Sequence, residues 1–172
     1  DIWIKSQPIG PATLVGARYL AGFGVIACYF SISLCIPIVF AFFHGSGMTI
    51  WFYALFGEFL QAAVMVAIAI LLAPHLPRII GTTAVTTIFF LGHLQVWIEP
   101  DLGTNFQGSA ILRLLLDAVP KLHRFSDPLL ANILGQKLPE LETLALTCIY
   151  GIGYIIGYLV IATSVEFQRD TA

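Results

Sequence analysis

Charged residues are scarce in this chain: eight Lys and Arg and ten Asp and Glu make up 10% of its 172 residues. An ordinary soluble domain carries about 25%, so eighteen charges cannot cover the surface of a soluble globular enzyme of this size. Disorder is excluded because 58% of the residues are hydrophobic and the mean hydropathy is +0.89. A net charge of −2 offers no basic face for nucleic acid. The composition therefore predicts an integral membrane protein.

Cysteines and catalytic motifs are scarce as well. The three cysteines, Cys28, Cys35 and Cys148, lie inside apolar runs without a C-x-x-C pair, which argues against a disulfide framework or a zinc site. The sequence has no G-x-x-x-x-G-K-S/T phosphate loop, no G-x-S-x-G and no H-E-x-x-H. No Ser or Cys has an evident base beside it. The chain is therefore predicted not to be an enzyme and to hold no cofactor of its own.

Long uncharged stretches are what the sequence does have. A helix needs about 20 mostly apolar residues to cross a bilayer. Strands of a membrane barrel would be about ten residues long and alternate in polarity, which these stretches do not. We expect an all-α polytopic protein, one membrane domain over residues 1–172. Its four predicted membrane helices cover residues 20–43, 50–73, 79–98 and 143–165.

The segment 99–142, between the third and fourth predicted spans, holds four of the eight basic and six of the ten acidic residues. Within it, residues 110–119 are apolar but too few to cross a bilayer, so they predict an interfacial or re-entrant helix. Pro120 would end that helix. A second short helix is predicted over 127–134, with Asp127 as its N-cap.

Orientation follows from the short connections, because Lys and Arg are enriched in short cytoplasmic segments. The loop 44–49 has no Lys or Arg, whereas the short segments on the opposite face hold four. These four are Lys5, Arg18, Arg78 and Arg169. We therefore expect both termini to be cytoplasmic and the segment 99–142 to lie outside.

Glu58 is the only charged residue inside a predicted span. It would lie about 12 Å below the outer end of its helix. A carboxylate at that depth is a candidate for proton relay or cation coordination. The alternative is a structural Glu that is protonated and hydrogen-bonded to a neighbouring helix, or that faces a watery groove. The sequence leaves the two open.

Two histidines are candidate ligands for a haem or a metal. His44 is expected at the outer end of the first span and His93 towards the outer end of the third. Two histidines at similar depth on neighbouring helices are the arrangement that a membrane haem needs. Both could instead be interfacial side chains with a polar tip.

The fourth predicted span carries the pattern Gly153-x-x-x-Gly157, which lets two helices approach closely. Tyr150, Tyr154 and Tyr158 recur every four residues and so line one face of this helix. The pattern predicts helix contact, within the chain or with a partner.

Residues 6–20 resemble the cytoplasmic stretch before the third membrane helix in permeases of type-2 ABC exporters. The family pattern there is roughly Ser-Arg-Pro-Ile-Ser-Arg, then an apolar pair, then Gly-Lys-Tyr-Leu. Gln7 stands where Arg is usual, and Ala17 and Arg18 replace the usual Lys. Six positions match: Ser6, Pro8, Ile9, Gly16, Tyr19 and Leu20.

Two further segments extend this resemblance over nearly the whole chain. Residues 118–127 are similar to a family element with Pro, two residues, then Phe, a small polar residue and Asp, which follows a short external re-entrant helix. The tail, with Glu166-Phe-Gln-Arg-Asp170, resembles the end of the last family helix, with Gln168 in place of an Arg.

The resemblance implies a permease worked by alternating access, with ATP bound by a separate ATPase subunit. Ser6, Pro8, Gly16 and Arg18 would couple to that ATPase, and Pro120, Phe125 and Asp127 would belong to the external gate. A second permease chain, identical or different, would complete the pathway. The implied location is the bacterial inner membrane, in contact with lipid and without nucleic acid.

The chain departs from the family in one respect, because such permeases usually have six spans and this sequence corresponds to the last four. A truncated N-terminus, a separate polypeptide for the first two helices, or a permease-derived subunit that no longer transports would each explain the difference. Two alternatives to an exporter therefore stay open. One is an accessory or structural subunit of a larger membrane complex, for example an energy-converting one. The other is a redox or ion-conducting protein that uses His44 with His93, or Glu58.

Overall fold

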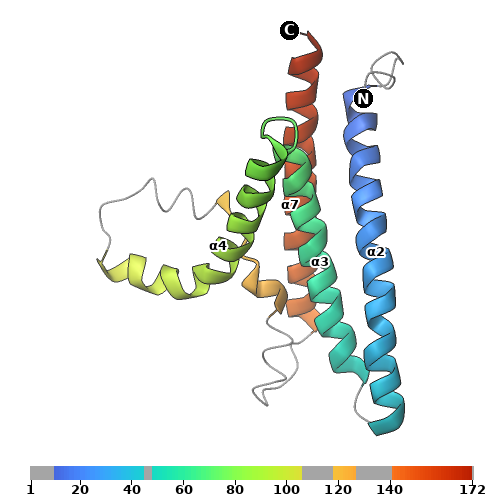
Figure 1. Cartoon of the computed structure of the whole chain (residues 1–172). Coiled ribbons are helices and arrows are strands. Elements are labelled where there is room, and N and C mark those ends of the chain that lie inside the picture. The colour runs from blue at the N-terminus through green and yellow to red at the C-terminus, as the bar shows by residue number, and fades with distance from the viewer. Residues whose placement is uncertain (1–9, 45–47, 106–117, 127–140, 172) are drawn as a thin grey trace.

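The computed structural model describes four long α-helices and a short segment, residues 118–126, that lies between the third and fourth of them in the chain (Figure 1). Within the described ranges there is no strand. The described residues are 10–44, 48–105, 118–126 and 141–171. The long helices are α2 (Pro11–His44), α3 (Met48–Leu72), α4 (Arg78–Asn105) and α7 (Leu141–Thr171).

All four helices are long and apolar enough to cross a membrane. This confirms the prediction of an all-helical chain with four helices of the length and apolar character that membrane spans need, which indicates an integral membrane protein. The stretches that meet the criterion of length and hydropathy are Pro11–Cys35, Leu55–Leu72, Arg78–Trp97 and Glu142–Gln168.

Helix α3 is the centre of the bundle, because α2, α4 and α7 all pack against it. Helices α2 and α7 also contact each other. Figure 1 shows the start of α2, the α3–α4 turn and the end of α7 at one end of the bundle, here called the termini end. The end of α2, the start of α3 and the start of α7 lie towards the other, the hairpin end. Consecutive helices therefore run antiparallel from α2 to α4.

Helices α2, α4 and α7 extend beyond the predicted spans at both ends, whereas α3 ends at Leu72, one residue before its predicted end. Helix α2 begins at Pro11, nine residues before the predicted start. Proline suits the first position of a helix because its missing N–H would have no partner there. The carbonyl oxygen of Gly10 accepts hydrogen bonds from the backbone N–H groups of Thr13 (3.0 Å) and Leu14 (3.1 Å), which closes the first turn.

Helix α4 continues past its predicted end at residue 98 to Asn105. Its last part changes direction (Figure 1). Pro100 lies in this part, and a proline inside a helix removes one backbone hydrogen bond and bends the axis. The uncharged stretch therefore marks the apolar part of the helix and not the point where the helix ends.

The buried core lies along α3. Leu60, Val64 and Ile68 recur every four residues and so share one face, where they form a cluster with Leu122 and Phe125. Most large apolar side chains on the outer faces of α2, α4 and α7 are exposed, among them Val25, Ile79 and Ile149. Exposed apolar surface on this scale is what the lipid or a protein partner covers in a membrane protein.

The two short helices predicted between the third and fourth spans fall mainly outside the described residues. Of the predicted 110–119 helix only 118–119 are described, and the predicted 127–134 helix is not described. Between them the structure has a helical turn over 123–126, which the sequence analysis did not predict.

Candidate functional site

The candidate site is built around residues 118–126, here called the inserted segment. Pro120, Leu122 and Phe125 are its buried side chains, and Leu122 and Phe125 have no exposed surface. The segment contacts α3, α4 and α7 through hydrogen bonds and packing described below. It therefore belongs to the bundle and is not a loop lying on its surface.

Two glycines make room for the inserted segment. A side chain at Gly57 of α3 would collide with the backbone carbonyl of Phe125. A Cβ at Gly92 of α4 would lie 2.6 Å from the carbonyl oxygen of Pro120 and 2.7 Å from Leu122 Cγ. Contacts shorter than 3.0 Å essentially do not occur for a real Cβ. Only glycine at these two positions lets the segment approach the helices this closely.

Side chains from α4 and α7 satisfy the irregular backbone of the segment. The hydroxyl of Tyr158 donates to the carbonyl oxygen of Ala118 (3.0 Å), and Nε2 of Gln95 donates to that of Val119 (3.2 Å). The backbone N–H of Lys121 donates to the hydroxyl oxygen of Tyr150 (2.7 Å).

The inserted segment also bonds to the backbone of α4. The N–H of Leu122 donates to the carbonyl oxygen of Gly92 (3.1 Å). The missing side chain at Gly92 thus serves two purposes, close approach and this direct bond. Nδ1 of His123 lies 3.5 Å from the same carbonyl oxygen.

These bonds matter because of their depth. Tyr158 is 17 residues after Leu141, the first residue of α7. At 1.5 Å per residue it lies about 25 Å along the helix. Non-helical backbone at such depth is tolerated only where protein covers it, since each unsatisfied polar group costs several kcal/mol in hydrocarbon. The tyrosine face that the sequence analysis recognised on this helix therefore serves to hold the inserted segment.

We predict that Tyr158→Phe lowers the free energy of unfolding by about 1 kcal/mol, because the carbonyl of Ala118 loses its donor. Tyr29→Phe is the control, since Tyr29 of α2 is 65% exposed. Denaturant unfolding in detergent micelles measures both. Equal effects of the two substitutions would contradict the assigned role of Tyr158.

A polar pair links α3 to α4 beside the inserted segment. Nδ1 of His93 lies 3.0 Å from the carbonyl oxygen of Phe89, and Nε2 of His93 lies 3.4 Å from Nε2 of Gln61. A ring nitrogen must carry a proton to bond a carbonyl, so the geometry assigns the proton to Nδ1. Nε2 then accepts from the Gln61 amide. Gln61 is only 3% exposed.

Glu58, the charged candidate, is on α3 one turn before Gln61 and is half-buried. It interacts electrostatically with His93 of α4. Glu58 thus lies on the side of α3 that faces His93, whose partner Gln61 is one turn further along α3, a pairing that the sequence does not reveal. The bond between Gln61 and His93 links α3 to α4.

The structure does not bring the two candidate haem ligands together. His44 is the last residue of α2, at the hairpin end. His93 pairs with Gln61, which is 13 residues after the start of α3 at Met48. That corresponds to about 20 Å along the helix. Within the described residues no group of three or more His, Cys, Asp and Glu could hold a metal ion.

The candidates for coupling to an ATPase lie at the termini end or outside the described residues. Arg18 of α2 forms an ion pair with Glu166 of α7, with 3.6 Å between Nη1 and Oε1. The Glu166 side chain is 8% exposed and that of Arg18 44%. Gly16 is half-buried and a Cβ there would meet no atom within 4 Å. Two other candidates are not described: Ser6 and Pro8.

Two small residues of α7, Gly153 and Gly157, lie away from the other helices that the structure describes. A Cβ at Gly153 or Gly157 would meet no atom within 4 Å, and both glycines are exposed. They line a groove of about 570 Å³. The glycine of α7 that does allow close packing is Gly151, where a Cβ would lie 2.8 Å from Leu60 Cγ. Among the described residues, the Gly153-x-x-x-Gly157 pattern is therefore not used for packing between helices of this chain.

The external-gate candidates are partly placed. Pro120 and Phe125 are both buried in the inserted segment, against α4 and α3 respectively. Asp127 lies outside the described residues. Four residues of the site escaped the sequence analysis: Gly57, Gly92, Gln61 and Gln95. Gln61 and Gln95 are uncharged polar residues inside apolar runs, a signal that could have found them, whereas nothing in the sequence distinguishes Gly57 and Gly92 from other glycines.

No family model, curated protein or solved structure matches this chain.

Proposed function

We propose that the chain is the membrane permease subunit of an ATP-driven exporter of the type-2 ABC class, with both termini in the cytoplasm of a bacterium. The observation that carries the proposal is the inserted segment. In the family that residues 6–20 resemble, a short external re-entrant element precedes the last membrane helix. Here an element with the same place in the chain is built into the bundle through Pro120 and Phe125.

The polar ties around this segment support a gating role. The segment bonds to α4 through Gly92 and Gln95 and to α7 through Tyr150 and Tyr158. A relative movement of α4 and α7 would therefore pull on both sides of the inserted segment. In an alternating-access cycle, such a movement of α4 and α7 would let a motion at the cytoplasmic end of the helices open or close the pathway at the external end.

The termini end supplies a route for that motion. The ion pair between Arg18 and Glu166 joins α2 to α7 next to the stretch that would lie against an ATPase. A partner that moves the start of α2 would thus move α7 as well. The exposed groove at Gly153 and Gly157 is open for a second permease chain.

The proposal is tested by purifying the chain under native conditions in mild detergent and identifying the co-purifying proteins by mass spectrometry. We expect a stoichiometric ATPase that carries a G-x-x-x-x-G-K-S/T loop. Cross-links from that ATPase should map to the start of α2 and to the α3–α4 turn. A stable set of other membrane subunits without such an ATPase would contradict the exporter and favour an accessory subunit of a larger complex.

A further inference from the structure

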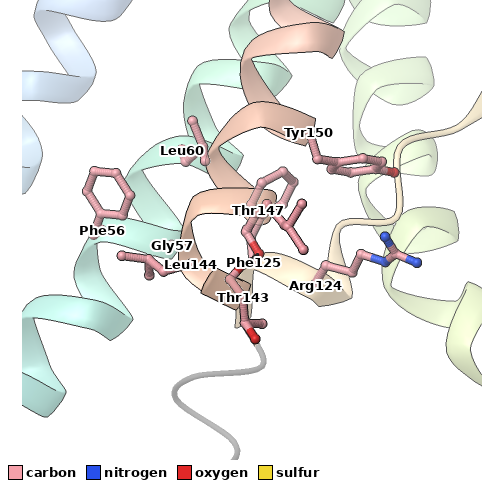
Figure 2. A pocket seen from close by; sticks show the side chains of 10 residues that line it. Phe56, Gly57, Leu60, Arg124, Phe125, Thr143, Leu144, Thr147 and Tyr150 are labelled. Carbon is pink, nitrogen blue, oxygen red and sulfur yellow. Dashed lines mark hydrogen bonds between the residues drawn. The ribbon is translucent and has the colours of Figure 1, made fainter. Parts of the chain in front are cut away.

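A cavity at the lower end of α7 in Figure 1 is not used by the proposed exporter function. It measures about 250 Å³ and lies between α3, the inserted segment and α7 (Figure 2). Much of its wall is apolar, with Phe56 and Leu60 from α3, Phe125 from the inserted segment and Leu144 from α7. Ligand pockets for drug-sized molecules are typically 300–1,000 Å³. This one is smaller and suits a single hydrocarbon chain.

One wall of the cavity carries a cation. Arg124 is exposed and its guanidinium carbon lies 5.4 Å from the centre of the Tyr150 ring. Figure 2 shows the Arg124 side chain reaching towards that ring at the edge of the site. Stacking of this kind holds the planar guanidinium in place and leaves its N–H groups available to an anion. Arginine binds phosphate oxygens through two parallel N–H groups.

The position of the cavity matches a membrane interface. Thr143, which lines it, is in the first turn of α7 next to the exposed Glu142. The apolar stretch of α7 begins there, at Glu142. Arg124 packs on Tyr150, two turns further along α7, and in Figure 2 its side chain lies between the levels of Thr143 and Tyr150. A long basic side chain at this level reaches the headgroups, and the apolar wall lies beside the hydrocarbon.

We propose that this cavity binds one acyl chain of an anionic phospholipid from the surrounding bilayer, with the phosphate held by Arg124. Charge and shape both select this occupant: a cation at the interface attracts an anionic headgroup, and the volume admits a chain and not a bulky ring system. The bound lipid would touch α3, α7 and the inserted segment together. It would therefore stabilise the arrangement of these three elements. This inference holds whether or not the chain is an exporter.

The test uses the full chain in phosphatidylcholine nanodiscs that contain a trace of photoactivatable lipid. One sample carries phosphatidylglycerol and the other phosphatidylcholine, each with a diazirine in the acyl chain. Cross-linked residues are then mapped by mass spectrometry. We expect the anionic lipid to label the α7 stretch 143–150 about fivefold more than the neutral lipid does, the ratio for about 1 kcal/mol of attraction to one arginine.

Variants separate the headgroup from the chain. Arg124→Gln should reduce labelling by phosphatidylglycerol to the level of phosphatidylcholine, whereas the matched control Arg78→Gln, at the termini end, should leave it unchanged. Leu144→Trp should fill the cavity and abolish labelling by both lipids. If Arg124→Gln fails to fold, the Leu144→Trp variant and the ratio of the two lipids in the unmodified chain still decide the matter.

Three results would overturn the inference. Equal labelling of 143–150 by both lipids would remove the role of the anionic headgroup. Labelling that persists in Leu144→Trp would mean that the chain does not enter the cavity. Displacement of the anionic lipid by excess inorganic phosphate would show that the site takes phosphate by itself and not a lipid.

Discussion

Gly57→Ala is expected to destabilise the folded protein, although alanine is the better helix former. The gain from helix propensity is about 0.5–1 kcal/mol. The new Cβ would collide with the backbone carbonyl of Phe125, which cannot rotate away as a flexible side chain can. Such overpacking typically costs about 1–3 kcal/mol. We expect a net loss of about 1–2 kcal/mol, which is about 2–8 °C in Tm for a chain of this size.

Gly153→Ala is the matched control. It also lies inside an apolar helix, but a Cβ there would meet no atom within 4 Å. Its melting temperature in detergent should stay the same or rise slightly, because only the propensity gain remains. If the two substitutions shift the melting temperature equally and in the same direction, the inserted segment does not approach α3 as described.

Phe125→Ala is expected to have the largest effect of any single truncation. Phe125 has no exposed surface and is the largest fully buried side chain among the residues that the structure describes. It packs against the core of α3 and lies 6.0 Å, centre to centre, from the Tyr150 ring. Truncation of a buried Phe costs about 3–5 kcal/mol. We expect the inserted segment to detach from the helices at a far lower denaturant concentration than in the unmodified chain.

Limited trypsin digestion reports this detachment directly, because Lys121 and Arg124 are in the same segment. Cleavage after these residues should be much faster in Phe125→Ala. Phe90→Ala serves as the control, since Phe90 is 59% exposed on α4. Its truncation should change stability by less than about 0.5 kcal/mol. Unchanged cleavage in Phe125→Ala would contradict the anchoring role of this side chain.

The membrane helices could be predicted from the sequence because their cause is local. An apolar run of sufficient length must form a helix in lipid, whatever its neighbours are. Helix ends were less predictable. The start of α2 at Pro11 and the extension of α4 to Asn105 lie in polar or charged sequence, where apolar length gives no signal. The preference of proline for the first position of a helix could have located the start of α2.

The site could be predicted only in part, because its contacts join residues far apart in the chain. Pro120 and Phe125 were identified as candidates through a resemblance, yet nothing in the sequence pairs them with Gly92 and Gly57. A glycine inside an apolar run has the same appearance whether it packs closely or faces open space. Gly57 and Gly153 illustrate the two cases.

Depth along a helix was the other source of error. His44 and His93 were expected at similar depth because each lies towards the outer end of its predicted span. The pairing of His93 with Gln61 places it about 20 Å along α3 from the hairpin end. Span limits deduced from hydropathy alone do not define a common membrane plane, because the helix ends depart from the predicted span ends by different amounts.

The central claim is that the inserted segment is built into the membrane bundle, and thiol accessibility tests it most directly. Single cysteines are introduced in a background without native cysteines, and membranes are treated with a water-soluble thiol reagent. Arg124→Cys should react readily, because Arg124 is exposed and lies near the headgroup level, where the reagent has access. Leu122→Cys and Phe125→Cys should be protected, because neither native side chain has exposed surface. Equal reactivity at all three positions would contradict the account, since a loop in water protects none of its residues.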